Sequence, residues 1–158
     1  EAGSYGKDVK GILRVHQFDK VEMYSFAHPE KSEEEHLFLL SMQEKIFQGL
    51  KIPYRVVAIC TGDMGPTDAR QFDIEAWMPS QNKYREIASC SNTTDYQTRG
   101  IGAKVKTKDS TKLAHALNAT AIAIGRTIIA ILENFQQEDG KILVPEALWK
   151  YTGFRVIG

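Results

Sequence analysis

The stretch LNATAIAIGRTIIAILENFQ, residues 117–136, carries a strand signal followed directly by a helix signal. We expect a strand over residues 113–118 and a helix over residues 121–137. The helix would place five large apolar side chains at helical spacing: Ile124, Ile128, Ile131, Leu132 and Phe135. Arg126 lies inside this apolar helix, where an unpaired charge is costly. The arginine therefore needs a partner or a ligand.

The chain upstream of this stretch is dominated by strand signals. Four further strands are predicted, over residues 12–26, 54–61, 71–78 and 84–91. Residues 54–61 are almost continuously apolar, which predicts burial on both faces. A helix is predicted to begin at Ser32, because Ser32 and Glu35 have the spacing of a capping box. Because the strands cluster without regular helical alternation, we expect an α+β fold, an antiparallel sheet with helices packed on it.

Composition excludes several classes of protein. The chain of 158 residues fits one domain. Lys+Arg and Asp+Glu both number 20, and this balance argues against a basic domain that coats nucleic acid. No apolar run is long enough to span a membrane, and the start lacks a signal-peptide pattern. Cys60 and Cys90 are too few for a disulfide framework and favour a reducing, cytoplasmic setting.

Four ordered stretches resemble the seryl branch of the class II aminoacyl-tRNA synthetases. Residues 1–22, EAGSYGKDVKGILRVHQFDKVE, resemble motif 2, and residues 85–99, REIASCSNTTDYQTR, resemble the strand and turn that hold the catalytic metal. Residues 117–136 resemble motif 3, and residues 138–153, EDGKILVPEALWKYTG, resemble the end of these enzymes. The resemblance implies a class II synthetase-type antiparallel sheet flanked by helices, with residues 1–158 as the C-terminal portion of the catalytic domain, lacking motif 1.

The resemblance also implies an activity. Such an enzyme activates L-serine with ATP to seryl-adenylate, releases pyrophosphate, and transfers serine to the 3′ end of serine tRNA. Mg²⁺ and positioned cations offset the charge that develops during transfer. The implied partners are L-serine, ATP, serine tRNA and a second copy of the full-length protein. No association with a membrane is expected. The implied location is the cytoplasm, with an organellar matrix as the alternative.

The resemblance assigns the ATP-binding residues. Arg14 and Arg126 are expected on the phosphates, because the planar guanidinium makes paired bonds to phosphate oxygens. The alternative for a single arginine is a solvated surface charge. His16 faces the same phosphates or is an exposed strand histidine. Phe18 stacks on adenine or belongs to the core, and Glu1 lies near the adenine and the tRNA end.

Glu86 and Ser89 resemble the magnesium ligands of the family. A carboxylate and a hydroxyl are hard oxygen donors, which Mg²⁺ prefers. The alternative for Glu86 is an exposed strand residue paired with Lys83 or Arg85. The resemblance assigns catalysis to Arg14, Arg126 and Glu86.

The resemblance places the amino acid against Glu22, Asn118 and Thr120. Glu22 would receive the serine ammonium group in a charge-assisted bond. Asn118 and Thr120 would bond the serine hydroxyl, and the alternative for both is helix N-capping. Asp73 and Glu75 alternate on one strand face. They form an acid–base pair or have a structural role. The structural role is favoured, because the implied reaction does not need a general acid of this kind.

Two features of the family fall outside the sequence. The first is the motif 2 arginine, which in the family lies two residues before the glutamate that matches position 1. The second is motif 1. The chain alone is therefore expected to be a weak catalyst. Two alternatives stay open: a paralogue that passes an amino acid to a carrier protein, and a non-catalytic binding module. Four lysines mark a solvated hairpin or loop, with tRNA phosphate as the alternative contact: Lys104, Lys106, Lys108 and Lys112.

Overall fold

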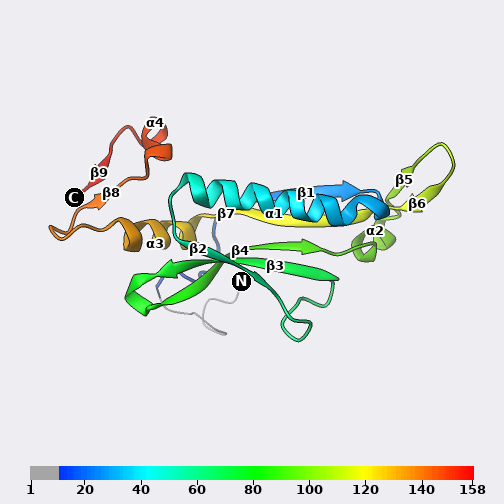
Figure 1. The fold of residues 1–158 in the computed structure, drawn as a ribbon, viewed down its shortest axis with the longest axis horizontal. Helices are drawn as coiled ribbons and strands as arrows, with labels where there is room; N and C mark the ends of the chain where they lie inside the picture. The colour runs from blue at the N-terminus through cyan, green and yellow to red at the C-terminus, as the bar shows by residue number, and fades with distance from the viewer. Residues whose placement is uncertain (1–10) are drawn as a thin grey trace.

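The computed structural model describes residues 11–158, and a five-stranded antiparallel sheet organises this part of the chain (Figure 1). The strands lie in the order β1-β7-β4-β3-β2, so the first strand pairs with a strand from the C-terminal half. Their bounds are Lys20–Ala27 for β1, Tyr54–Ala58 for β2, Arg70–Met78 for β3, Lys83–Asn92 for β4 and His115–Ala123 for β7. The α+β fold expected from the sequence is confirmed.

Helix α1 (Ser32–Gly49) covers one face of this sheet and runs along β1 and β7 (Figure 1). Phe47 on the helix and Ile74 on β3 are fully buried and belong to one apolar cluster. Ala88, Cys90 and Ala119 present the same face of the sheet to that cluster. Burying a side chain as large as Phe47 contributes roughly 1.5–3 kcal/mol to folding, so the helix–sheet contact holds the described residues together.

Helix α3 (Ile124–Phe135) continues directly from β7. Ala130 is buried in the core, and Asn134 Nδ2 donates a hydrogen bond to the Trp77 carbonyl at 2.9 Å. The remaining elements are short: η1 (Pro29–Lys31), η2 (Pro79–Gln81), α2 (Tyr96–Ile101), β5 (Lys104–Lys106), β6 (Thr111–Leu113), β8 (Ile142–Leu143), η3 (Glu146–Leu148), α4 (Trp149–Thr152) and β9 (Val156–Ile157). No helix within residues 11–158 is long and apolar enough to cross a membrane.

Helix α1 begins at Ser32 as predicted, but the predicted capping box is wrong. Ser32 Oγ donates to the Pro29 carbonyl at 3.1 Å, which closes the preceding η1 turn. Glu35 instead accepts from Ser25 Oγ on β1 at 2.7 Å. Ser32 Oγ also lies 2.8 Å from His115 Nδ1, so both side chains contact other segments and the helix starts without a side-chain cap.

Two predicted strand boundaries and one predicted burial pattern are also wrong. β1 starts at Lys20 rather than at residue 12. β7 extends to Ala123, because its antiparallel pairing with β1 continues as far as Lys20 and Ala123, and this pairing overrides the helical periodicity of residues 121–123. β2 is half-exposed rather than buried on both faces, because it is the edge strand of the described sheet.

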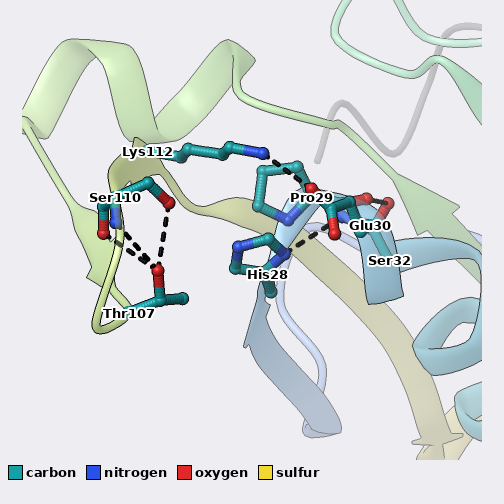
Figure 2. A network of polar contacts seen from close by, with 7 residues as sticks. All are labelled: His28, Pro29, Glu30, Ser32, Thr107, Ser110 and Lys112. Atoms are coloured by element: carbon teal, nitrogen blue, oxygen red, sulfur yellow. Dashed lines mark hydrogen bonds and ion pairs between the residues drawn. The ribbon is translucent and has the colours of Figure 1, made fainter.

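A polar network ties the lysine-rich hairpin to the start of α1 (Figure 2). Thr107 and Ser110 close the turn between β5 and β6 with hydrogen bonds of 3.0–3.2 Å. Lys112 Nζ donates to Glu30 Oε1 at 2.6 Å, and His28 Nδ1 accepts from the Glu30 amide at 3.3 Å. The predicted hairpin is therefore confirmed, and one of its lysines is held in an ion pair.

Candidate active site

The face of the sheet opposite α1, here called the open face, is lined with polar side chains. Residues paired across antiparallel strands share a face, and successive residues alternate. Cys90 pairs with Ala119 on the helix-covered face, so their neighbours point the other way. The pairs on the open face are Glu22 with Thr120, Ser91 with Asn118, Asp73 with Ser89 and Glu75 with Glu86.

A bulge in β4 brings the two predicted metal ligands onto this one face. Glu86 and Ser89 are three residues apart, so a regular strand would point them to opposite faces. The register shifts between Ile74 and Glu75 of β3, and Ile87 of β4 is left without a partner. One extra residue of this kind re-aims the side chains that follow it. Both oxygen-bearing side chains therefore face the same space.

A pocket of about 170 Å³ lies on the open face between β4 and β7. Its lining includes Phe18, Lys20, Glu86, Ser89, Thr120 and Arg126. Five of these six residues are predicted site residues. Arg14 and His16 are not among the lining residues, and they lie in the irregular segment before β1 rather than on a strand. Glu1 lies outside the described residues.

Arg126 is held at the pocket by three contacts. Its Nη1 donates to the Glu86 carbonyl at 2.9 Å and lies 3.3 Å from Glu86 Oε2, and its Nε donates to the Leu13 carbonyl at 3.3 Å. The side chain is only 20% exposed, whereas that of Glu86 is 48% exposed. The charge in the apolar helix thus has the partner that the sequence required, and these contacts fix the guanidinium in the lining of the pocket.

Phe18 lines the same pocket and is 37% exposed. An aromatic side chain so exposed is not a core residue, so the core alternative is wrong. Its ring lies in the same lining as Arg126. An aromatic face and a cation in one small pocket can together receive a base and its phosphates.

Glu22 lies beside the pocket, where it pairs across β1 and β7 with the lining residue Thr120. Thr120 Oγ1 donates to Glu22 Oε2 at 3.1 Å, and Lys20 Nζ lies 3.1 Å from the same oxygen. Thr120 is buried and Asn118 half-buried on the same strand. The capping alternative for both is wrong, because the residue before α3 is Ala123 and the cap has no side-chain hydrogen bond.

Asp73 and Glu75 share the open face, as their alternation predicted, but their surroundings differ. Burial, with a smaller contribution from the carboxylates of Glu86 and Glu75, raises the pKa of Asp73 to about 6, although the hydrogen bond from Gln71 and the Arg126 guanidinium act to lower it. Gln71 Nε2 donates to Asp73 Oδ1 at 2.8 Å. Glu75 instead forms an exposed ion pair with Arg55 at 2.6 Å.

Two contributors were missed in the sequence. Lys20 lines the pocket and pairs with Glu22, and its position two residues before Glu22 on an alternating strand was the available signal. Gln43 on α1 donates to the carbonyls of Ser89 and Thr120 beneath the pocket, and nothing in its local sequence indicates this. Within residues 11–158, no group of three or more His, Cys, Asp or Glu side chains is arranged to hold a metal ion.

Comparison with known proteins supports the same architecture. Residues 1–135 match the family model of the tRNA synthetase class II core domain (G, H, P, S and T). The chain belongs to the class II tRNA synthetase core family. The α+β fold, with its antiparallel sheet and covering helix, is that of a class II core.

The curated relatives of this class II core are serine–tRNA ligases. The chain is 55% identical to the serine–tRNA ligase of Thermococcus sibiricus over 99% of the chain and 35% of the relative. It is 54% identical to that of Rubrobacter xylanophilus, of which it covers 38%. The chain therefore spans about a third of the length of the curated relatives it matches.

Solved structures of seryl-tRNA synthetases have the same fold as this chain. The seryl-tRNA synthetase of Pyrococcus horikoshii, complexed with ATP, superposes with a TM-score of 0.93 at 52% identity, over 99% of this chain and 35% of that one. The cytoplasmic serine–tRNA ligase of Naegleria fowleri, in complex with AMP, gives a TM-score of 0.89 at 43% identity, over 98% and 37%.

Proposed function

We propose that the protein carrying this class II core is a serine–tRNA ligase. It activates L-serine with ATP to seryl-adenylate, releases pyrophosphate, and transfers serine to the 3′ end of serine tRNA. The observation that carries the proposal is a single pocket that joins a fixed guanidinium, an exposed aromatic ring and a hydroxyl bonded to a carboxylate. The 55% identity to a serine–tRNA ligase supports serine as the amino acid.

ATP is proposed to enter the pocket with its adenine on Phe18 and its phosphates on Arg126. Arg126 is suited to this role because its Nη1 and Nε are already oriented by the Glu86 and Leu13 carbonyls. A fixed fork of donors binds phosphate oxygens with little further loss of freedom. Arg14 and His16 are proposed to reach the phosphates from the segment before β1. The relatives solved with ATP and with AMP support a nucleotide in such a core.

Serine is proposed to bind on the β1–β7 side. Its ammonium group would bond Glu22, whose Oε2 already receives Lys20 Nζ and Thr120 Oγ1, so that carboxylate accepts cations and hydroxyls alike. The serine hydroxyl would meet Thr120 and Asn118. Alanine would lack the hydroxyl that meets the buried Thr120 and the half-buried Asn118, and the walls of the small pocket would exclude threonine.

Mg²⁺ is proposed to bind Glu86 and Ser89. The carboxylate and the hydroxyl are hard oxygen donors that the β4 bulge directs to one face, which fits this ion. Mg²⁺ usually keeps several positions for water and phosphate oxygens, so two protein ligands suffice. When bound, it would neutralise charge on the departing pyrophosphate.

These residues account for adenylate formation. The serine carboxylate attacks the α-phosphorus, and the bond from that phosphorus to the oxygen bridging toward the β-phosphate breaks. Glu22 holds the ammonium group, and Arg126 offsets the repulsion between the carboxylate and the phosphates. The protein mainly positions two anions against each other, a contribution that can exceed that of any single chemical group.

The remaining expectations belong to the whole protein. We propose serine tRNA as the acceptor, a homodimer as the assembly, and the cytoplasm as the location. One relative is named a cytoplasmic serine–tRNA ligase. Residues 1–158 are proposed to form the C-terminal portion of the catalytic domain.

The test is amino-acid-dependent exchange of pyrophosphate into ATP by the full-length protein, followed by charging of serine tRNA. Serine should support exchange, and alanine and threonine should not. Exchange without tRNA charging, but with loading of a carrier protein, would replace this proposal by the paralogue. A folded protein without exchange would be a binding module.

A further inference from the structure

The pocket lies where two neighbouring strands part. Direct pairing of β4 with β7 covers only Cys90–Ala119, Ser91–Asn118 and Asn92–Leu117. Just beyond this point each strand carries an irregularity, at Ile87 in β4 and at Ala121 in β7, where the register against its other neighbour shifts. The strands stop pairing there, and the pocket lining lies on both of them.

One side chain from α1 bridges the two strands at this point. Gln43 is fully buried, and its Nε2 donates to the Ser89 carbonyl at 2.8 Å and to the Thr120 carbonyl at 2.8 Å. A side-chain amide has two N–H bonds, and both are used. Because one nitrogen holds both carbonyl oxygens, these oxygens lie no more than twice that distance apart.

A helix–sheet contact of this kind does not require glutamine. Leu40 and Phe47 fill the same helix face with apolar side chains. Among residues 11–158, Gln43 Oε1 is buried without a hydrogen-bond partner, and such an atom costs free energy. His36 lies two turns earlier on the same face, and its side chain bonds the Cys90 carbonyl, inside the paired region. The Gln43 contact, which spans β4 and β7, therefore lies where direct pairing of these two strands ends.

We infer that Gln43 is a positioning residue for the proposed synthetase site. Its amide clamps β4 to β7 where direct pairing ends. The clamp fixes the backbone of Ser89, on the metal and phosphate side, against the backbone of Thr120, on the serine side. The separation of these two backbones sets the width of the pocket in which serine carboxylate and ATP phosphate meet. This inference rests on the proposed function.

Three variants of the full-length protein test the clamp. Gln43→Met keeps the size of the side chain and removes both donors. Gln43→Asn keeps the amide but shortens its reach by one methylene, so that it holds one carbonyl at most. Gln48→Met is the matched control, because Gln48 lies on the same helix and its amide donates to Tyr54 OH at 2.8 Å at an exposed site.

Calorimetry gives the Kd of each variant for a non-hydrolysable seryl-adenylate analogue. Kinetics give the KM for serine, kcat and the preference for serine over alanine. Thermal unfolding gives the midpoint that reports stability. Gln43→Met should weaken analogue binding and raise KM for serine by about tenfold, which corresponds to about 1.4 kcal/mol. Preference for serine should fall, since the backbone that carries the Thr120 hydroxyl is no longer held against the phosphate side. Gln43→Asn should give a smaller loss, and Gln48→Met should stay within about twofold of wild type.

A merely structural glutamine predicts another pattern, namely a lower thermal midpoint and lower kcat with unchanged KM, Kd and preference. That pattern in Gln43→Met overturns the clamp. If Gln43→Met does not fold, Gln43→Asn decides: weakened analogue binding at a near-native midpoint supports the clamp, and unchanged binding overturns it. A folded wild type without serine-dependent exchange or analogue binding overturns the proposed function, and the clamp with it.

Discussion

Replacing Arg126 by lysine tests whether the fork of the guanidinium, rather than its charge, serves the phosphates. The structure gives the arginine a 2.9 Å bond from Nη1 to the Glu86 carbonyl, a 3.3 Å ion pair with the Glu86 carboxylate and a 3.3 Å bond from Nε to the Leu13 carbonyl. Lysine can keep the ion pair but not the two directed bonds to carbonyls. The side chain is largely shielded from solvent, so these bonds are little screened.

The magnitude follows from these contacts. A hydrogen bond to a charged group contributes roughly 1.5–3 kcal/mol, and the longer Nε bond contributes at the low end. Loss of the two bonds to the Glu86 and Leu13 carbonyls should therefore destabilise the free protein by about 3–4 kcal/mol. Loss of the paired bonds to phosphate, at about 2 kcal/mol, should raise Kd for ATP about 30-fold. Binding of serine alone should change little, because Glu22 and Thr120 keep their bond.

Calorimetric titration of ATP and of serine, with urea unfolding in parallel, measures all three quantities. Arg70→Lys is the control, because Arg70 pairs with Glu33 at an exposed site away from the pocket lining. A change of less than threefold in ATP affinity for Arg126→Lys, with Arg70→Lys unchanged, would refute the reasoning. It would place Arg126 among residues that only hold β4 to α3.

Three further predictions address the core, the buried carboxyl and the amino-acid side. Phe47→Ala should lower the free energy of unfolding in urea by about 3–5 kcal/mol, whereas Leu37→Ala on the exposed face of the same helix should change it by less than about 0.5 kcal/mol. Without Mg²⁺ or ATP, the raised pKa of Asp73, about 6, means that the native state binds a proton more tightly than the unfolded state, so stability falls as pH rises from about 4 to 6. Asp73→Asn should remove this dependence and add roughly 2–3 kcal/mol at pH 8, and an unchanged pH profile of the thermal midpoint would contradict the assignment. Glu22→Gln should raise KM for serine about 30-fold with Kd for ATP unchanged, while Glu35→Gln, which alters a carboxylate bonded to Ser25, should leave both constants unchanged.

Periodicity predicted the core of the sheet well. A strand was predicted over residues 71–78, and three of its apolar side chains, Ile74, Ala76 and Met78, are fully buried. The resemblance to class II synthetases predicted the antiparallel sheet and most of the pocket lining. These features could be found because each lies in a local pattern or a contiguous motif.

The remaining geometry depends on tertiary pairing. The bulge at Ile87, which brings Glu86 and Ser89 to one face, follows from register against β3 and has no local signal. In the sequence, Gln43 looks like an ordinary polar position of a helix. Its two bonds to strand carbonyls form only once the helix packs on the sheet. The extension of β7 to Ala123 likewise follows from its partner strand, because pairing with β1 outweighs local helical periodicity.

The most direct test of the proposed function is exchange of labelled pyrophosphate into ATP by the full-length protein, with each candidate amino acid supplied separately. We predict exchange that depends on serine and Mg²⁺, is absent with alanine or threonine, and falls at least tenfold in Glu22→Gln at subsaturating serine. Exchange that is equal with all three amino acids, or absent from the folded full-length protein, would contradict the assignment of this pocket to serine activation.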